Sequence, residues 1–335
     1  MNNAYIGHDN QLYGIEEHRL VGGKGDGVRL LQVRNGKGLE FTVVADRCCD
    51  ISRLSYKANN YSFISTTGYA HPAFYDREGS GWLRSFTAGY LTTCGLTAVG
   101  GAEVFEGEKL PLHGLIANEP AEHVAWYEDE GKLVIRARIP HVQVMGEKLI
   151  LNRVYEISTE KNEFTITDTI ENQDANPSPL MILYHMNMGY PLLSETAELV
   201  IPSCKVQGRN DFAQADIAHW SEITEPQPGI EEKCYFHSFD HDGVAALYNP
   251  AIGSGVEIRF DPENLDYFTQ WKMMGARDYV LGLEPGNCSP DGRGWMKKQG
   301  TLKYLAPGEK KTYQVRVSIV ESEEDWQARK NSYKK

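Results

Sequence analysis

The stretch Phe164-Thr165-Ile166-Thr167-Asp168-Thr169-Ile170 places apolar side chains at alternate positions, with threonines between them. Successive side chains of a β-strand point to opposite faces, so this pattern predicts a strand with one buried face. Similar short runs recur along the chain, at residues 30–33, 41–44, 124–127, 133–139, 149–157, 163–170, 197–201, 244–248, 255–260 and 312–318.

Turn-forming residues separate these runs, as at Asn35-Gly36, Asp129-Glu130-Gly131, Glu160-Lys161-Asn162 and Asp242-Gly243. Many short strands joined by turns predict an all-β fold, a large antiparallel β-sandwich of two sheets packed face to face. Helix should make up less than about a fifth of the chain. One helix is expected at residues 322–329, where a serine cap precedes three acidic residues.

Composition narrows the class of protein. Of 335 residues, 41% are hydrophobic and 24% charged, and the formal net charge is −12. The acidic balance argues against nucleic acid and anionic membranes as partners. No apolar run reaches the roughly 18 residues of a membrane span. The N-terminus lacks the features of a secretory signal, so we expect a cytoplasmic protein. Without linkers or repeats, residues 1–335 are predicted to form one domain.

The cysteines and histidines give no metal or disulfide motif. Six cysteines are too few for a disulfide scaffold in a chain of this length. Cys48 and Cys49 are expected to face opposite sides of a strand, and the other four cysteines to be small buried residues. His237 and His241 would need a helix to share a zinc ion, but a turn is predicted there. No metal or other cofactor is therefore expected.

Two apolar stretches each end in a titratable group. Leu180-Met181-Ile182-Leu183-Tyr184 leads into His185 and Asn187, and Tyr279-Val280-Leu281-Gly282-Leu283 leads into Glu284 before Pro285. Proline holds the preceding residue extended, so the second strand should continue to its carboxylate. Two such strands could supply an acid and a base across a cleft. Alternatively, His185 is a buried histidine bonded to a nearby carbonyl.

Together these stretches resemble the aldose 1-epimerase (galactose mutarotase) superfamily, specifically an uncharacterised bacterial branch. The resemblance extends from about residue 30 to residue 317 and includes Asp46-Arg47-Cys48-Cys49-Asp50-Ile51, Thr92-Thr93-Cys94-Gly95-Leu96, Pro111-Leu112-His113-Gly114 and Gln270-Trp271-Lys272. It implies that Glu284 is the base and His185 the acid that open a sugar ring at C1. It also implies that His113 binds the sugar near the ring oxygen, unless this histidine lies in solvent.

Further substrate-binding candidates are Asn187, Arg84, Arg209 or Asp211, Trp271 and Lys272. Arg84 stands where the family carries a substrate-binding arginine, although it could form a surface ion pair instead. No clear match exists for the family's sugar-binding aspartate, and Asp211 or Arg209 could replace it. Two arginines would suit an acidic or phosphorylated sugar. Trp271 could stack on a sugar and Lys272 could bind a hydroxyl, or they could be a core tryptophan and a solvated lysine.

Three functions are compatible with these residues. The pair His185 and Glu284 favours a cofactor-independent isomerase that interconverts the anomers of an aldose or an acidic derivative. The alternative is a non-catalytic carbohydrate-binding protein, which would need no acid–base couple. A hydrolase would require two carboxylates, and only Glu284 stands out. In each case the expected partner is a small carbohydrate, and the oligomeric state is open.

Two other segments carry structural expectations. In Asp46-Arg47-Cys48-Cys49-Asp50 two carboxylates surround one arginine, which indicates an ion pair that is structural or borders the site rather than being catalytic. Residues 69–81 are rich in Gly, His, Pro and Asp and lack regular periodicity, so a long loop is expected there. Such a loop either covers a site or is a surface excursion.

Overall fold

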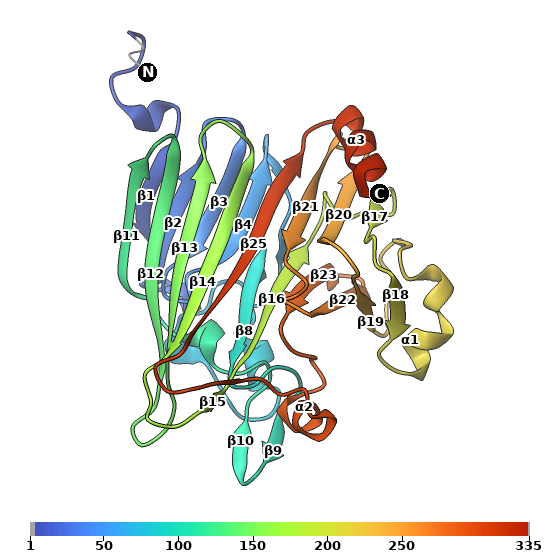
Figure 1. Ribbon diagram of the computed structural model, residues 1–335. Helices are drawn as coiled ribbons and strands as arrows, with labels where there is room; N and C mark the ends of the chain where they lie inside the picture. Colours follow the sequence, from blue (N-terminus) through green and yellow to red (C-terminus); the bar gives the residue numbers. More distant parts are fainter. Residues whose placement is uncertain (1–3, 334–335) are drawn as a thin grey trace.

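A computed structural model describes residues 4–333 of the chain (Figure 1). Strands make up 46% and helices 13% of it, which confirms the predicted all-β class and the low helix content. Each predicted strand segment overlaps an observed strand. Within the described residues, no helix combines the length and the apolar character needed to cross a bilayer.

The largest sheet has eight antiparallel strands. In spatial order they are β11 (Glu122–Asp129), β12 (Lys132–Val142), β13 (Lys148–Ser158), β14 (Glu163–Asn172), β25 (Lys310–Val320), β21 (Ser254–Phe260), β20 (Gly243–Asn249) and β17 (Glu198–Val200). Residues 164–170 therefore lie in a central strand, β14, between β13 and β25.

Two further sheets form the second layer of the sandwich. One comprises β1 (Gly14–Arg19), β2 (Arg29–Arg34), β3 (Leu39–Val44), β4 (Asp50–Tyr56) and β5 (Asn59–Asn60). The other comprises β18 (Lys205–Gly208), β19 (Lys233–Ser238), β22 (Tyr267–Met274), β23 (Tyr279–Gly286), β16 (Met181–Met188) and β8 (Leu91–Leu96). Figure 1 shows the first of these sheets behind β11–β14.

Short elements connect these sheets. The short strands are β6 (Phe63–Ile64), β7 (Ala88–Gly89), β9 (Glu103–Phe105), β10 (Glu108–Leu110), β15 (Ser178–Pro179) and β24 (Tyr304–Leu305). The helices are α1 (Asp211–Ala215), α2 (Arg293–Gln299) and α3 (Glu323–Tyr333), with 3-10 turns η1 (Asp9–Gln11), η2 (Gly23–Gly25), η3 (Pro72–Phe74), η4 (Gly81–Arg84), η5 (Ile116–Asn118) and η6 (Ile217–His219).

The apolar core lies between the two layers. The ring of Phe41 on β3 packs against Phe164 on β14, with centroids 4.8 Å apart. The ring of Phe260 on β21 stacks on Phe268 of β22 at 5.5 Å. Both smaller sheets therefore bury their inner faces against the same large sheet, as the alternating pattern of β14 requires.

A fully buried arginine links the layers. Arg153 on β13 bonds both oxygens of Asp168 at 2.9 and 2.7 Å and Asp50 Oδ1 at 2.6 Å. It also donates to Thr93 Oγ1 at 2.8 Å. The hydroxyl of Tyr184, which precedes His185 on β16, donates to Asp168 Oδ2 at 2.9 Å. This Arg153 cluster connects the large sheet to β4, β8 and β16.

The predicted ion pair between Arg47 and a neighbouring carboxylate does not form. Arg47 bonds two backbone carbonyls, those of Ala117 and Ala70, rather than a carboxylate. Asp46 instead pairs with Arg29 at 2.8 Å, and Asp50 pairs with Arg153. Residues 45–49 form a turn, and tertiary folding rather than proximity in sequence brings Arg29 and Arg153 alongside the two carboxylates.

The cysteine predictions are also corrected in part. Cys48 and Cys49 are buried but lie in a turn, with φ of 50° and 55°, rather than on a strand. Cys204 is exposed instead of buried, whereas Cys94, Cys234 and Cys288 are buried as expected. All six thiols are free.

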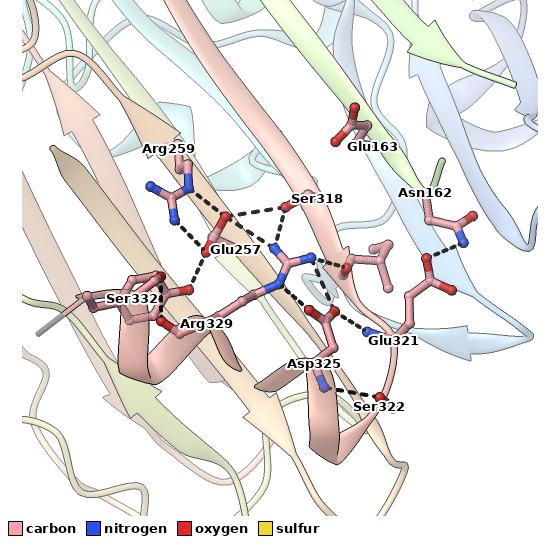
Figure 2. Close-up of polar contacts among 12 residues, drawn as sticks. Asn162, Glu163, Glu257, Arg259, Ser318, Glu321, Ser322, Asp325, Arg329 and Ser332 are labelled. Carbon is pink, nitrogen blue, oxygen red and sulfur yellow. Dashed lines mark hydrogen bonds and ion pairs between the residues drawn. The ribbon is translucent and has the colours of Figure 1, made fainter. Parts of the chain in front are cut away.

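The predicted C-terminal helix forms as α3, and Ser322 accepts a bond from the Asp325 N–H as its cap. Figure 2 shows how Arg329 holds this helix against the sheet: it bonds Asp325, Ser318 and Glu257. Glu257 on β21 is 4% exposed and also accepts bonds from Arg259 and from Tyr333.

Glu257→Gln is expected to lower the free energy of unfolding by about 2 kcal/mol at neutral pH, because it removes the charge from several hydrogen bonds. Burial alone would raise the pKa of Glu257, but Arg259, Tyr333 and Arg329 outweigh burial and lower it. Its stabilisation is therefore present above the unfolded pKa and lost as pH falls through the folded one. Urea unfolding at several pH values measures this, with the exposed Glu324→Gln as control; an equal loss in both variants would contradict the prediction.

Candidate active site

His185 and Glu284 are cross-strand neighbours in the six-stranded sheet. Strands β16 and β23 are antiparallel, and their register pairs Leu183 with Gly286 and Met186 with Leu283. The same register places His185 opposite Glu284, although 99 positions separate them in sequence. The two side chains lie on one face, with His185 Nε2 3.4 Å from Glu284 Oε1.

Both side chains line an open pocket with about 720 Å³ of empty space, a volume that includes solvent at its mouth. The lining residues are Trp82, Leu83, Phe86, Leu112, His113, His185, Arg209, Glu232, Cys234, Thr269, Trp271, Glu284 and Pro290. Cys234, Thr269 and Trp271 come from the same face of β19 and β22, because alternate residues of a strand share a face. The sheet therefore forms the floor of the pocket.

His113 reaches the pocket from a tight turn. Its φ is 55°, and that of Gly114 is 75°. A side chain on Gly114 would place its Cβ 2.2 Å from the Gly95 carbonyl oxygen, so glycine is required there. The His113 ring lies edge-on to the His185 ring, with centroids 5.6 Å apart.

Burial controls the protonation of the pair. It lowers the pKa of His185 to about 4 and raises the pKa of Glu284 well above its ordinary value, with a smaller contribution from the charge of Glu232. Burial also lowers the pKa of His113 to about 3. The open pocket therefore favours a neutral imidazole beside a protonated carboxyl. The roles implied by the family resemblance, with Glu284 as base and His185 as acid, would instead require a carboxylate beside an imidazolium.

His185 and Glu284 nevertheless share one titratable proton, whether it resides on the carboxyl group or on the imidazole. Moving that proton from Glu284 to His185 changes the charges but not the proton count. Apart from their mutual contact, Glu284 Oε1 and His185 Nδ1 are buried and have no hydrogen-bond partner within residues 4–333. Unsatisfied buried groups cost free energy, and a pair of them at a cavity is typical of a functional site.

Arg209 and Trp271, both predicted from sequence, also line the pocket. Arg209 Nε bonds Asp291 Oδ1 at 2.9 Å, and its Nη2 donates to the Pro290 carbonyl. Trp271 Nε1 donates to Glu232 Oε2 at 2.7 Å. Its ring lies 5.2 Å from that of His185.

Four predicted substrate-binding residues lie outside this pocket. Lys272 points to the opposite face of β22, where its Nζ donates to the His219 carbonyl, so it cannot share a ligand with Trp271. Asn187 is fully buried and bonds the carbonyls of Gly89 and His185. Asp211 is exposed at the start of α1, and Arg84 is exposed in η4, beside the pocket-lining Leu83.

Sequence reasoning missed part of the lining. Glu232 lies in a loop with no motif, so nothing in the sequence indicated it. Trp82 and Phe86 follow directly on the predicted loop at 69–81, and they, rather than the loop itself, line the pocket. The two aromatic residues close together after this loop were the feature of the sequence that could have indicated them.

Comparison with known proteins places this geometry in context. A family model described as "Domain of unknown function (DUF4432)" matches residues 25–319. No curated protein is detectably similar to the sequence. Among solved structures, a proposed aldose 1-epimerase from Klebsiella pneumoniae superposes with a TM-score of 0.89 at 25% identity, over 97% of this chain and 89% of that one.

Two more distant structures share the fold. A galactose mutarotase-like protein from Clostridium acetobutylicum has a TM-score of 0.68 at 15% identity, over 92% of this chain and 99% of that one. A proposed aldose 1-epimerase from Escherichia coli K12 has a TM-score of 0.59 at 14% identity, over 91% and 99%. The fold is therefore that of the galactose mutarotase-like proteins.

Proposed function

Because this chain belongs to the DUF4432 family, a domain of unknown function, we propose its activity from the pocket itself: it interconverts the anomers of an aldose by opening the ring at C1. The observation that carries the proposal is the contact of 3.4 Å between His185 and Glu284 within a pocket of sugar-sized dimensions. One acid and one base, held together across the reacting atoms, are sufficient for this reaction.

In the opening step Glu284 takes the proton of the C1 hydroxyl. The C1–O5 bond breaks, C1=O1 forms, and the electron pair left on O5 takes a proton from His185. Rotation about C1–C2 presents the other face of the aldehyde, and closure returns both protons. The ring-closed sugar is thus bound by a carboxylate and an imidazolium, and the open-chain sugar by the neutral pair.

Burial favours the neutral pair, since it penalises both charged forms. The pocket therefore stabilises the protonation state of the open-chain stage relative to that of the closed ring. His113, edge-on to His185, is placed to bind near the ring oxygen. Arg209 and Glu232 offer hydrogen bonds to the remaining hydroxyls.

The test is whether a bound sugar exchanges its anomers faster with the protein than without it. Two-dimensional NMR exchange spectroscopy on a panel of aldoses reports both anomers and binding in one experiment. Catalysed exchange of at least one aldose is expected. Binding of aldoses without any acceleration would instead support a carbohydrate-binding protein.

The pH profile of kcat/KM is expected to be bell-shaped, because this parameter reports the free enzyme. Below about pH 4, the pKa of His185, the pair gains a second proton and no base remains. Above the raised pKa of Glu284 the pair loses its proton and no acid remains. The acidic limb should therefore fall near pH 4. A carboxylate–imidazolium pair with ordinary pKa values would instead place its basic limb at about pH 6.5, the histidine value, so a basic limb there would contradict the neutral pair.

A further inference from the structure

One side of the pocket is an apolar wall formed by Trp82, Phe86 and Leu112. The rings of Trp82 and Phe86 stack with centroids 4.3 Å apart, and Leu112 packs against them. Trp82 is 3% exposed and Phe86 is 7% exposed. The polar atom of this wall, Trp82 Nε1, is itself buried and has no partner in the described chain. The wall therefore presents carbon rather than hydrogen-bonding groups to a ligand.

The wall adjoins the acid of the proposed reaction. Phe86 meets the His185 ring edge-on at a centroid distance of 5.6 Å, and Trp82 packs against His113 at 5.0 Å. His185 also contacts Trp271, which packs against the same aromatic cluster. If His185 protonates O5, then C5, which is bonded to O5, lies next to these rings. The substituent on C5 is consequently directed at an aromatic and apolar surface.

The charges of the pocket point the same way. Among its described lining residues Arg209 is the permanent cation, and Asp291 already neutralises it at 2.9 Å. Glu232 and Glu284 add carboxyl groups, and the imidazolium that His185 forms in the reaction is balanced by the Glu284 carboxylate beside it. A carboxylate or phosphate at C5 would be desolvated against the wall without a counter-charge.

We propose that the substrate is an uncharged aldose whose C5 carries hydrogen or a methyl group, that is, a pentose or a 6-deoxyhexose. This inference rests on the proposed anomer interconversion, because that reaction fixes where O5 lies. It replaces the expectation of an acidic or phosphorylated sugar. A hydroxymethyl group at C5 would lose its hydrogen bonds to water and gain none from Trp82, Phe86 or Leu112.

Sugars that differ only at C5 test the proposal. The galacto set is L-arabinose, D-fucose, D-galactose and D-galacturonate, and the gluco set is D-xylose, D-quinovose, D-glucose and D-glucuronate. In a set whose anomers exchange, kcat/KM is obtained from the NMR exchange rates. It should be at least about tenfold higher for the sugar with hydrogen or methyl at C5 than for the parent sugar with hydroxymethyl. The kcat/KM of the uronate should be lower still, by about 100-fold or more relative to the hydrogen or methyl member.

Leu112→Gln supplies a hydrogen-bonding group to the wall and should lower the ratio of methyl to hydroxymethyl rates severalfold. Val104→Gln, which alters an exposed residue of β9 outside the pocket, should leave that ratio unchanged. Because the readout is a ratio, a general loss of folded protein does not affect it. Equal or faster exchange of the parent hexose or uronate would overturn this inference and leave the proposed function intact. Lack of exchange for every sugar would overturn both.

Discussion

Replacing Glu284 with glutamine is expected to slow catalysed anomer exchange by about 10²–10⁴-fold, the usual contribution of a general acid or base. The amide preserves the size of the side chain and its place opposite His185, but it can neither accept the O1 proton nor carry the proton of the pair. Sugar affinity should change much less, because Arg209, Glu232 and His113 remain. A loss in kcat with little change in binding is the signature of a group needed in the transition state.

The measurement compares exchange rates with a dissociation constant from the fluorescence of Trp82 and Trp271. Glu17→Gln, an exposed glutamate of β1, is the matched control and should retain the full rate. His185→Asn should reduce exchange from the acid side. Full exchange activity in the Glu284→Gln protein would show that another group is the base, even if the protein is an isomerase.

Replacing Arg153 with methionine is expected to lower the free energy of unfolding by about 3–5 kcal/mol, as is typical when one partner of a buried ion pair is removed. Asp168 and Asp50 would remain buried, at 0% and 5% exposure, without their cation. The Thr93 hydroxyl and the Cys48 carbonyl would lose their contacts to the guanidinium as well. A loss of this size is a large fraction of the stability of an ordinary domain.

Urea unfolding of the Arg153→Met protein measures the effect. Arg136→Met, on the exposed side of β12, is the control and should stay within about 0.5 kcal/mol of the wild type. Adding Asp50→Asn and Asp168→Asn removes the stranded charges and should restore much of the stability. A loss below about 1 kcal/mol in the single variant would contradict the role assigned to the Arg153 cluster.

The strand content and the candidate pair His185 and Glu284 could be predicted from the sequence because both depend on local patterns. Alternation sets which face of β14 is buried, and the apolar runs that lead to His185 and Glu284 mark buried strands, although β16 continues to Met188 and β23 to Gly286 instead of ending at these residues. A shared register then brings the two residues together. That register is not visible in either stretch alone.

Other contacts depend on tertiary structure and could not be read locally. The partner of Arg47 is decided by carbonyls at positions 70 and 117, far from the two carboxylates beside it. Trp271 and Lys272 were treated as one motif, although strand geometry sends them to opposite faces. The protonation of His185 and Glu284 reflects burial by segments distant in sequence. The local sequence therefore does not indicate which of the two groups carries the proton.

The division of the pocket between two kinds of structure has a consequence for protein engineering. His185 and Glu284 lie on neighbouring strands, whereas Trp82 lies in η4, Phe86 follows it and Leu112 follows β10. These three wall residues form no hydrogen bond with His185 or Glu284. Libraries confined to apolar residues at positions 82, 86 and 112 would consequently diversify the sugars accepted while His185 and Glu284 keep their places on the strands and their burial. A catalyst for anomers of unnatural deoxysugars could be sought in this way without rebuilding its scaffold.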